Sequence, residues 1–408
     1  MNRTATAARP TLAIIDYETV PTNPVGSVHR RVIAALADRY DITVFSVRFD
    51  NPRPDRVRWV RVPAVRRPLL ALFCSFHLMV LLRYGWERLR RHRFDVVQSI
   101  ESFSLLGAVV HAQFCHRFFV DHAELGSWAP GYRGWVRQVF ERAAGLLEPL
   151  AFRRAALIVV PSLGAGRSIT EYHPSAAAKL RLAYNGVDLD RFVAPPRFDA
   201  VACRRELGVP GSACVLVFVA LGHFERKGLP VVLDAMQQLG DPAVHLLVVG
   251  GTAQATAPYR RRVGACGLED RVHFCGAVDD VRPFLWCADA FVLPSSYEGF
   301  PLVALEAAAA GLPLLATPVN GVEEILVDGD TGLVLDRDAT GVADVLRRFL
   351  ALEPAARRSM GRDARRAVER YSDEAMVAAW SRAYDEVRGR TAARVPSRST
   401  DGRNTVRR

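Results

Sequence analysis

Short apolar runs alternate with longer segments of mixed polarity along the first half of the chain. The runs cover residues 11–17, 41–47, 94–100, 107–114 and 156–162, and polar or turn residues bound each of them. Strands of a parallel sheet have this pattern, because helices cover both faces of the sheet. The spacers are long enough for helices, and the segment that ends near Tyr40 has a helical apolar period. This half therefore predicts an α/β domain with a parallel sheet.

The same pattern restarts after residues 185–199, a segment with Asn, Gly and two consecutive Pro residues that is typical of a linker. Further strands are expected at residues 213–222, 244–251, 271–276, 290–296, 312–317 and 331–335. We therefore predict two doubly wound Rossmann-like domains, at 1–190 and 191–370, and a helix at 371–387 that crosses back to the N-terminal domain. Ligands of such sheets bind at the carboxyl ends of the strands, so the cleft between the domains is the expected site.

The net charge of +11 is concentrated in two segments. Residues 56–93 hold ten Arg against one Glu, and residues 388–408 hold seven Arg against one Asp, so the remainder is slightly acidic. A basic surface over the whole protein, as nucleic-acid binding requires, is therefore not expected. The tail at 388–408 is rich in Arg, Ser and Thr and is expected to be disordered. The chain starts without the apolar core of a signal peptide, and its seven scattered cysteines lack C-x-x-C spacing or metal-like clustering, so a cytoplasmic protein with reduced thiols is expected.

Two glutamates stand out in the sequence YEGFPLVALEAAAAGLP. Glu298 lies in a turn after an expected strand, and Glu306 is the only charged residue between Pro301 and Leu315. Pro301 suits the first position of a helix and Gly311 suits its carboxyl-terminal cap, so Glu306 is expected in mid-helix with no partner one turn away. Burial of an unpaired carboxylate is unfavourable, and a distant Arg or a ligand rich in hydroxyl groups must offset it. An ordinary buried ion pair for Glu306 and a solvated loop position for Glu298 are the alternatives.

The turn after residues 213–222 combines glycine with positive charge. Gly222 and Gly228 bracket it, it contains Arg226 and Lys227, and a helix is expected to start near Pro230. Backbone N–H groups and a helix dipole favour an anion at such a turn. We therefore expect the two cations to stabilise charge that develops on a phosphate leaving group. A solvated basic loop is the alternative.

The compound motif Y-E-G-F-P-x4-E-A-x3-G-x-P resembles the E-x7-E signature of the retaining glycosyltransferases of the GT-B superfamily, in particular family GT4. The flanking sequences GAVDDVRPFLWCADAFVLPS and ATPVNGVEEILVDGDTGLVL fit the same family, as does RLAYNGVDLDRF at 181–192. The resemblance is strong over residues 180–387 and extends to the N-terminal domain only as a pattern. It implies a GT-B fold and the transfer of a sugar from a nucleotide-diphosphate sugar to a glycan or lipid-linked acceptor, in cell-envelope polysaccharide or glycolipid synthesis.

The resemblance also implies a role for individual residues. Glu306 would bind the ribose hydroxyls of the donor, Glu298 the hydroxyls of the donor sugar, and Val278 would lie beside the nucleobase. The backbone around the turn would line the sugar and phosphates, through Gly299, Phe300, Pro301 and Leu302. Many relatives carry an arginine four residues before E-K-G, where this chain has Gly222 and His223. The chain instead resembles the F-x-R-K-G variant of lipopolysaccharide-core glucosyltransferases.

The sequence offers only single residues, and no long motif, as candidates for the acceptor side of the site. The loop at 21–31 follows the first strand, and its Gly26 would let a phosphate or sugar approach the next helix, although a plain turn explains it as well. Two histidines, His111 and His116, lie at the end of the strand expected at 107–114, after which relatives often have a histidine that meets the reacting sugar. We favour His116 as a catalytic residue because of its position after the strand, and a core or surface histidine is the alternative for both. Glu101 ends another strand at the same edge.

A mechanism with retention of configuration needs no base to activate water, and a double displacement needs a nucleophile beneath the anomeric carbon. No clear nucleophile occurs in the N-terminal half, so a front-face transfer is expected, in which the donor phosphate accepts the acceptor's proton. No cofactor and no metal are expected besides the nucleotide-sugar co-substrate. The sequences DLD at 188–190 and DGD at 328–330 are interpreted as structural.

Residues 66–93 place 15 mostly apolar residues between Arg67 and Arg83. This stretch is shorter than the roughly 20 residues that span a bilayer. It fits an interfacial helix on an anionic membrane surface, which residues 131–154 would extend, and a peripheral location at the inner face of the plasma membrane follows from it. A core helix with an exposed Arg rim is the alternative.

Other functions agree less well with the sequence. A phosphorylase of the same architecture needs a well-placed pyridoxal lysine, and neither Lys179 nor Lys227 is suitable. A sugar-nucleotide epimerase shares the architecture, and a non-catalytic basic membrane adaptor would show no selective binding of nucleotide sugars. A Rossmann oxidoreductase is not favoured, because no G-x-G-x-x-G follows the first strand of either domain.

Overall fold

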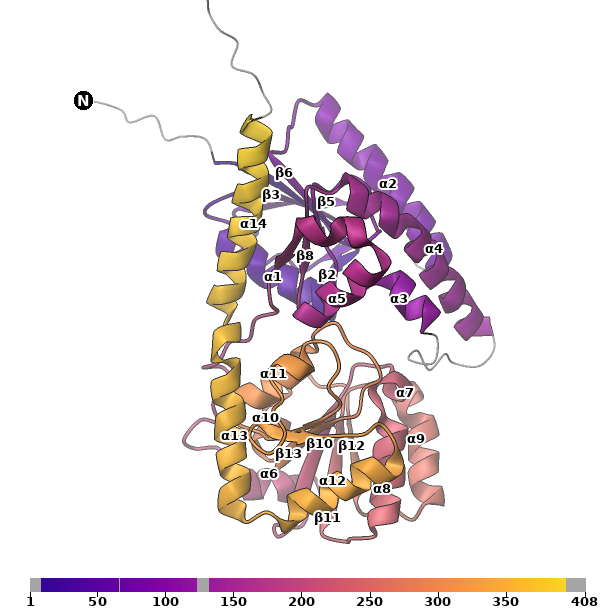
Figure 1. The fold of residues 1–408 in the computed structure, drawn as a ribbon, viewed down its shortest axis with the longest axis vertical. Coiled ribbons are helices and arrows are strands. Elements are labelled where there is room, and N and C mark those ends of the chain that lie inside the picture. The colour runs from indigo at the N-terminus through magenta and orange to yellow at the C-terminus, as the bar shows by residue number, and fades with distance from the viewer. Residues whose placement is uncertain (1–8, 66, 123–131, 394–408) are drawn as a thin grey trace, which may run out of the picture.

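The N-terminal domain is built on a parallel seven-stranded sheet with the order β5-β3-β1-β6-β7-β8-β9. The computed structural model describes residues 9–65, 67–122 and 132–393 (Figure 1). The strands are β1 (Thr11–Ile15), β3 (Asp41–Ser46), β5 (Val57–Arg61), β6 (Val96–Ile100), β7 (Val109–His111), β8 (Leu157–Val160) and β9 (Leu180–Leu182). All five strands expected in this half are present. The sequence analysis missed β5 and β9, which lie at the two edges of the sheet.

Five α-helices connect these strands: α1 (Pro24–Leu36), α2 (Leu69–Leu89), α3 (His116–Asp121), α4 (Tyr132–Arg154) and α5 (Leu163–Tyr172). Asn23 caps α1 by accepting a hydrogen bond from the N–H of Gly26, and Pro24 occupies the first turn. A short ribbon of β2 (Glu18–Thr19) and β4 (Arg48–Phe49) extends the ends of β1 and β3, and a 3-10 helix (Pro174–Lys179) precedes β9.

The C-terminal domain repeats the architecture with a parallel six-stranded sheet in the order β12-β11-β10-β13-β14-β15. The strands are β10 (Cys214–Val219), β11 (Val244–Val249), β12 (Val272–Gly276), β13 (Ala290–Leu293), β14 (Leu314–Ala316) and β15 (Gly332–Val334), so every strand expected in this half is present. The helices are α6 (Ala200–Glu206), α7 (Phe224–Lys227), α8 (Leu229–Leu239), α9 (Ala253–Ala265), α10 (Arg282–Trp286), α11 (Leu302–Ala309), α12 (Ala339–Ala351) and α13 (Pro354–Val368). Short 3-10 helices lie at Val322–Glu324 and Glu369–Tyr371.

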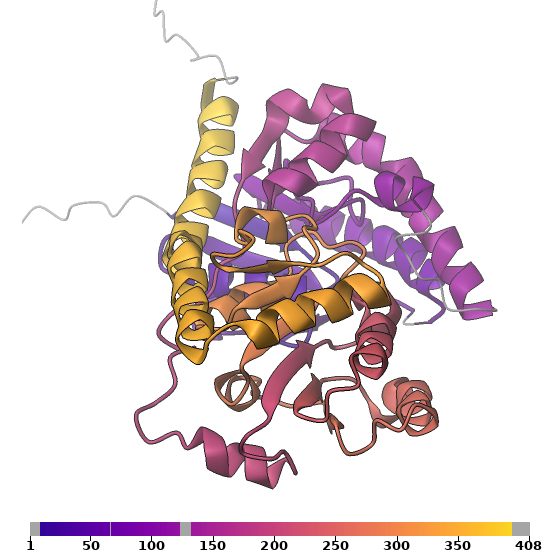
Figure 2. The same cartoon turned by 60° about the horizontal axis from the view of Figure 1, so that its bottom comes forward.

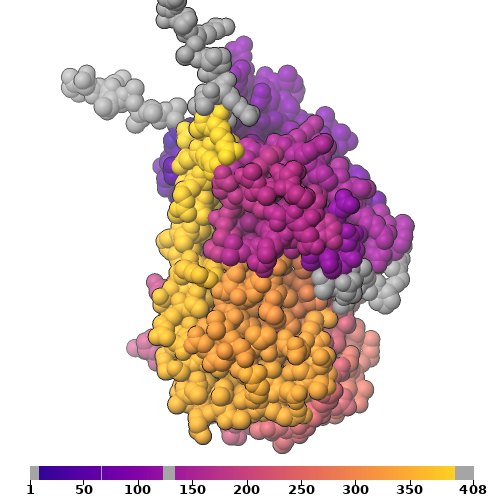
Figure 3. Space-filling model, in the orientation of Figure 1, coloured from indigo at the N-terminus to yellow at the C-terminus, as the bar shows by residue number. Residues whose placement is uncertain are grey.

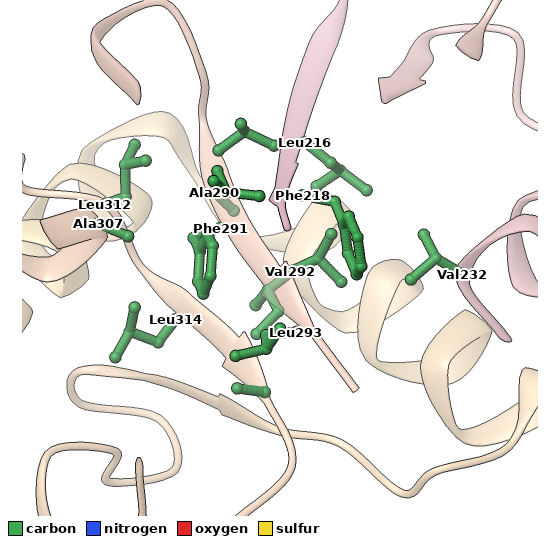
Figure 4. Close-up of a cluster of buried hydrophobic side chains, with 14 of the residues drawn as sticks. Leu216, Phe218, Val232, Ala290, Phe291, Val292, Leu293, Ala307, Leu312 and Leu314 are labelled. Carbon is green, nitrogen blue, oxygen red and sulfur yellow. The ribbon is translucent and has the colours of Figure 1, made fainter. Parts of the chain in front are cut away.

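The core of the C-terminal domain consists of apolar residues from the central strands and the helices on either side. Figure 4 shows Phe218 of β10 and Phe291 of β13 between the sheet and its helices, and both side chains are fully buried. Burial of apolar area at about 25 cal/mol per Å² is the main stabilising term. The alanines of α11 let this helix pack closely on β13 and β14.

The last helix, α14 (Asp373–Ala393), leaves the C-terminal domain and packs on the N-terminal domain (Figures 1 and 2). Its buried residues Met376, Trp380 and Tyr384 belong to the same apolar cluster as β1 and α1. The space-filling view shows α13 and α14 in succession along one side of the molecule, α13 beside the C-terminal domain and α14 beside the N-terminal domain, and the two domains are in direct contact on this face (Figure 3). The disordered tail was predicted to begin at residue 388, but residues 388–393 are helical, so this boundary was wrong. The rest of the predicted tail lies outside the described residues.

The helix α2 differs from the expected short apolar segment. It has 21 residues and is continuous through Arg83 to Leu89, and by length and composition alone it is the one helix of the described residues that can cross a membrane. Its residues Phe76 and Val80 are nevertheless buried against the N-terminal sheet. The opposite side of α2 is exposed, at Leu78 and Leu82 among others.

Candidate functional site

The carboxyl-terminal ends of the two sheets meet at the boundary between the domains. The hydroxyl of Ser162, after β8, donates to the carbonyl of Gly299 at 2.6 Å, and the amide of Asn185 donates to the carbonyl of Phe300 at 3.0 Å. A Cβ at Gly299 would lie 2.1 Å from the carbonyl oxygen of Gln113, so the close approach of the domains requires glycine here. The turn that contains the predicted sugar ligand Glu298 is therefore part of the domain boundary.

Glu298 forms an ion-pair cluster with the two predicted phosphate-binding cations. Its Oε1 lies 2.8 Å from Nζ of Lys227 and 3.2 Å from Nη1 of Arg226, and it accepts a hydrogen bond of 2.8 Å from Ser295. Glu298 is only 8% exposed, and burial alone would raise its pKa. The attraction of both cations and the hydrogen bonds from Lys227 and Ser295 outweigh burial and lower the pKa to about 2. The carboxylate is therefore ionised at neutral pH.

The turn after β10 differs from the expected loop, because it forms the short helix α7, with Arg226 and Lys227 in its last turn. Gly228 ends α7 with φ of 83°, and a Cβ there would lie 2.3 Å from the carbonyl of Pro294, so both conformation and packing require glycine. Gly222 is different, because a Cβ there would meet no atom within 4 Å. The guanidinium of Arg226 also donates to the carbonyl of Tyr297, which connects α7 to the turn that carries Glu298.

Glu306 lies on α11 and is half-buried, not fully buried as its apolar surroundings suggested. Its backbone carbonyl accepts the N–H of Ala310, but its carboxylate forms no hydrogen bond or ion pair with another described residue. Burial raises its pKa, and the charges of Arg31 and Arg191 offset only part of that effect. Pro301 precedes the helix as its N-cap instead of occupying the first turn, whereas Gly311 follows the carboxyl-terminal cap with φ of 81°, as expected. A carboxylate in this state can accept hydrogen bonds from hydroxyl groups.

Three other predicted donor residues differ in what their side chains contact. Phe300 is buried against the aromatic rings of Tyr184 and Tyr371, so only its backbone is available to a ligand. Leu302 packs against the apolar cluster of the N-terminal domain, and Val278, after β12, is half-buried at the edge of the C-terminal core.

His116 begins α3 and is buried between two carboxylates. Its Nδ1 lies 2.7 Å from Glu141 of α4, and its Nε2 lies 3.0 Å from Glu101 after β6. Burial disfavours the imidazolium, but the two carboxylates outweigh burial and raise the pKa of His116 well above its ordinary value. The backbone N–H of His116 donates to Glu148 at 2.5 Å. Both ring nitrogens of a protonated His116 therefore donate to carboxylates, and the ring holds together three segments of the N-terminal domain.

His111, the alternative histidine, is fully buried at the end of β7. Its Nδ1 lies 2.7 Å from Nε2 of His29, whose Nδ1 lies 2.7 Å from Asp16, and its Nε2 lies 2.8 Å from the amide of Gln113. Burial and the nearby His29 lower the pKa of His111 well below its ordinary value, so it is neutral. This chain of polar groups leads from the core to Gln113 at the domain boundary.

Close packing of the backbone explains why residue 26 is a glycine. A Cβ there would lie 2.2 Å from the carbonyl oxygen of Glu18 and 2.9 Å from the N of Val20, and the Gly26 N–H already donates to Asn23. The plain-turn alternative thus suffices to explain this glycine.

The sequence analysis missed a contact between the domains. Nη1 of Arg137, on α4, lies 3.0 Å from Nδ1 of His223, which precedes α7. Arg137 also lies 3.5 Å from Glu141, one of the two carboxylates that hold His116. No sequence motif marks this pair, because α4 and the turn after β10 are brought together only by the packing of the two domains.

Cys115, Glu148 and His173 are buried and place their ligand atoms within 4.8 Å of one another, contrary to the expectation that the cysteines show no metal-like clustering. Glu148 accepts the backbone N–H groups of His116 and Arg117, at the amino-terminal end of α3. Donors that point at the carboxylate disfavour a cation at the same oxygens. The carboxylate therefore acts as a cap of α3.

Comparisons with known proteins agree with this architecture. The family model described as "Glycosyltransferase Family 4" matches residues 25–191, and the model described as "Glycosyl transferases group 1" matches residues 213–351. Glycogen synthase of Mycobacterium tuberculosis is 30% identical over 361 residues, which are 86% of this chain and 78% of that protein.

Two solved structures illustrate the likeness in fold. Sucrose-phosphate synthase of Thermosynechococcus elongatus superposes with a TM-score of 0.76 at 22% identity, over 94% of this chain and 100% of that chain. HepE of Anabaena, in complex with UDP and glucose, superposes with a TM-score of 0.70 at 18% identity, over 93% of this chain and 100% of that chain. On the evidence of the family models and the glycogen synthase relative, this chain belongs to the group 1 glycosyltransferases of family 4, and its fold is GT-B.

Proposed function

We propose that this glycosyltransferase moves a sugar from a nucleoside-diphosphate sugar to a glycan or lipid-linked acceptor, with retention of anomeric configuration. The observation that carries the donor assignment is the ion-pair cluster of Arg226, Lys227 and Glu298 at the carboxyl ends of β10 and β13. Sites at the carboxyl ends of parallel strands are the usual ligand sites of such sheets. The complex of Anabaena HepE with UDP and glucose supports a nucleotide-sugar donor by analogy of fold.

In this proposal, the donor diphosphate binds Arg226 and Lys227 beside the open space at Gly222. Negative charge grows on the diphosphate as the glycosidic bond breaks, so the two cations stabilise the transition state more than the ground state. Glu306 binds the ribose hydroxyls, since its carboxylate has no partner among the described residues. Glu298 binds hydroxyls of the donor sugar, and Val278 contacts the nucleobase.

Retention would follow from a front-face transfer, in which a donor phosphate oxygen accepts the proton of the acceptor hydroxyl. A double displacement needs a carboxylate free to attack the anomeric carbon. Three buried carboxylates of the N-terminal domain, Glu101, Glu141 and Glu148, are all hydrogen bonded to histidines or backbone N–H groups. His116 lies between two of them, so we now favour a positioning role for it over contact with the sugar.

A thermal-shift screen with UDP-, GDP-, ADP- and dTDP-sugars tests the donor assignment. Selective stabilisation by one nucleotide is expected, because a ligand that binds only the folded state raises its stability. The anomeric configuration of the product, determined by NMR, then tests retention, and net inversion would refute it. Turnover is expected to persist in EDTA, because the proposed charge stabilisation uses Arg226 and Lys227 and no metal. If none of the four nucleotide classes stabilises the protein, the donor assignment is wrong.

We also propose that α2 rests on an anionic membrane surface, which would suit a lipid-linked acceptor. Its outward side exposes Leu78, Leu82, Trp86 and Leu89, at 58%, 57%, 52% and 78%, with a spacing of three or four residues along the helix. The guanidinium of Arg90 stacks over Trp86 at 4.9 Å from the ring centroid. Apolar and aromatic side chains beside arginines are typical of helices that lie in the membrane interface.

Co-sedimentation with vesicles tests this second proposal. Binding is expected with vesicles that contain anionic phosphatidylglycerol and not with pure phosphatidylcholine. The double variant Leu78→Ser, Leu82→Ser should bind much less, whereas Val193→Ser, which is 51% exposed in the linker, should bind like the wild type. Binding that is independent of anionic lipid or unchanged in the double variant would refute the membrane surface.

A further inference from the structure

Gln113 follows β7, an inner strand of the N-terminal sheet, at the boundary between the domains. A Cβ on Gly299 would lie 2.1 Å from the backbone oxygen of Gln113 and 3.9 Å from its side-chain Oε1, so Gln113 faces the turn that contains Glu298. The strand β7 is buried over its whole length, whereas Gln113 is only half-buried. The carboxyl ends of parallel strands are the usual ligand sites of such sheets. The amide of Gln113 therefore lies where a ligand of the boundary is expected.

A chain of buried polar groups sets the orientation of this amide, and it starts at α14. Tyr384 donates its hydroxyl to Oε1 of Gln98, so the group of Gln98 that faces His29 is Nε2, at 2.9 Å from Nε2 of the ring. An amide Nε2 is a donor, and Nε2 of His29 therefore accepts. The other ring nitrogen of His29, Nδ1, carries the hydrogen and donates it to Asp16 at 2.7 Å.

His111 continues this chain to the boundary. Its Nδ1 lies 2.7 Å from Nε2 of His29 and donates to it, because that nitrogen is an acceptor. Burial and the nearby His29 lower the pKa of His111, so the ring is neutral and its Nε2 accepts. The group of Gln113 at 2.8 Å from this nitrogen is therefore the amide Nε2. Oε1 of Gln113 then receives no hydrogen bond from any residue that the structure describes.

We propose that Gln113 is a specificity-determining residue whose Oε1 accepts a hydrogen bond from one hydroxyl of the transferred sugar. This inference rests on the proposed donor. Glu298, the proposed ligand of other sugar hydroxyls, directly precedes Gly299, so the two acceptors reach adjoining parts of the boundary from opposite domains. An amide oxygen only accepts hydrogen bonds, and a sugar hydroxyl is a matching donor. Gln113 would thus favour donors that carry this hydroxyl over their deoxy counterparts.

A purely structural role for Gln113 makes a different prediction. If its amide only completes the hydrogen bonds of His111, its removal should weaken the nucleoside diphosphate and the nucleotide sugar to the same extent. If Oε1 binds a sugar hydroxyl, its removal should weaken the nucleotide sugar alone. The loss should then disappear with a donor analogue that lacks this one hydroxyl.

The experiment is an isothermal titration of the full chain with three kinds of compound. The first is whichever of the UDP-, GDP-, ADP- and dTDP-sugars stabilises the wild type most, and the second is its free nucleoside diphosphate. The third is a set of analogues of that nucleotide sugar, each of which lacks one sugar hydroxyl. The variants are Gln113→Met, which keeps the length of the side chain without its amide, and Gln113→Ala. Gln237→Met is the matched control, because Gln237 is exposed on α8. Melting temperatures confirm that the variants are folded.

Loss of one neutral hydrogen bond should lower the affinity of both Gln113 variants for the nucleotide sugar by about 2- to 10-fold. Their affinity for the diphosphate should change by less than about 1.5-fold, and Gln237→Met should match the wild type. One analogue should bind the wild type more weakly than the complete donor does, but should bind Gln113→Met as well as the complete donor does.

Three results would overturn the inference. These are equal losses for the diphosphate and the nucleotide sugar, an unchanged affinity for the nucleotide sugar, and a loss in Gln113→Met that is the same with every analogue. If the wild type binds neither the nucleotide sugars nor their diphosphates, the proposed function itself fails.

Discussion

The substitution Glu298→Gln tests whether the ion-pair cluster at the domain boundary has the strength that its geometry indicates. The carboxylate lies 2.8 Å from Lys227 and 3.2 Å from Arg226, and its pKa is lowered from 4.5 to about 2. At about 1.4 kcal/mol per pKa unit, ionised Glu298 contributes about 3 kcal/mol to folding at pH 7. The neutral amide of Gln keeps the size of the side chain but removes this term, so the variant should be destabilised by up to that amount.

The stabilisation that ionised Glu298 contributes is expected to decrease in acid. Because the pKa in the folded state is below that of the unfolded chain, the stabilisation is present above pH 4.5 and is lost as the pH falls through 4.5 toward 2. The difference between wild type and Glu298→Gln should therefore shrink to about 2 kcal/mol at pH 3.5. Sodium chloride should have little effect on it, because the pair is largely shielded from solvent.

Urea denaturation followed by far-UV circular dichroism at pH 7 and pH 3.5 gives the required free energies. Each transition is fitted separately, because two domains need not unfold together. Glu269→Gln is the control, since Glu269 is exposed in the same domain, and it should change stability by less than about 0.5 kcal/mol. A Glu298→Gln variant as stable as the wild type at pH 7, or a difference that does not shrink in acid, would refute the reasoning.

Three further substitutions test other parts of the site. Glu306→Ala should weaken nucleotide binding by at least about 10-fold by titration calorimetry without loss of stability, because removal of a half-buried, unpaired carboxylate costs the free protein nothing. His116→Asn should destabilise the N-terminal domain by about 3 kcal/mol or more, seen as a lower melting temperature at neutral pH, because two buried carboxylates lose their cation. The pKa of His116 is raised, so this stabilisation is complete below pH 6.5 and disappears only as the pH rises through the folded-state pKa. Gly299→Ala should separate the domains, which increased hydrogen exchange at Gln113 would report, since a Cβ would lie 2.1 Å from that carbonyl.

The central strands of both domains were predictable because they are apolar on both faces. Each expected run contains a strand, and β10 and β13 are buried over their whole length. The edge strand β5, with the sequence VRWVR, was missed because Arg58 and Arg61 interrupt its apolar residues and three of its five residues are exposed. The strand β9 has only three residues, none of which is fully buried, so it leaves no apolar run in the sequence.

The part of the candidate donor site that lies within the C-terminal domain was predictable from the sequence. Glu298, Arg226 and Lys227 lie after adjacent strands of one sheet, so their proximity follows from the order of β10 and β13. The contact of Arg137 with His223 depends on how two separately folded domains meet, and no local pattern encodes that geometry. The role of Glu141 and Glu148 as partners of His116 was likewise hidden, because both carboxylates lie on the irregularly patterned α4.

The contact of Glu298 with Arg226 and Lys227 in the free protein has a consequence for the proposed binding of the donor. In the free protein Glu298 pairs with both Arg226 and Lys227, and these contacts occupy lone pairs of its carboxylate. If the donor binds as proposed, its phosphates compete for both cations and release Glu298 to accept sugar hydroxyls. Because Glu298 then loses its two cations, binding of the diphosphate raises the pKa of Glu298. By linkage, ionisation of Glu298 weakens binding of the diphosphate by the same free energy. Occupancy of the phosphate site is thereby coupled to the availability of the sugar ligand, so Glu298 contacts sugar hydroxyls only when a complete donor is present.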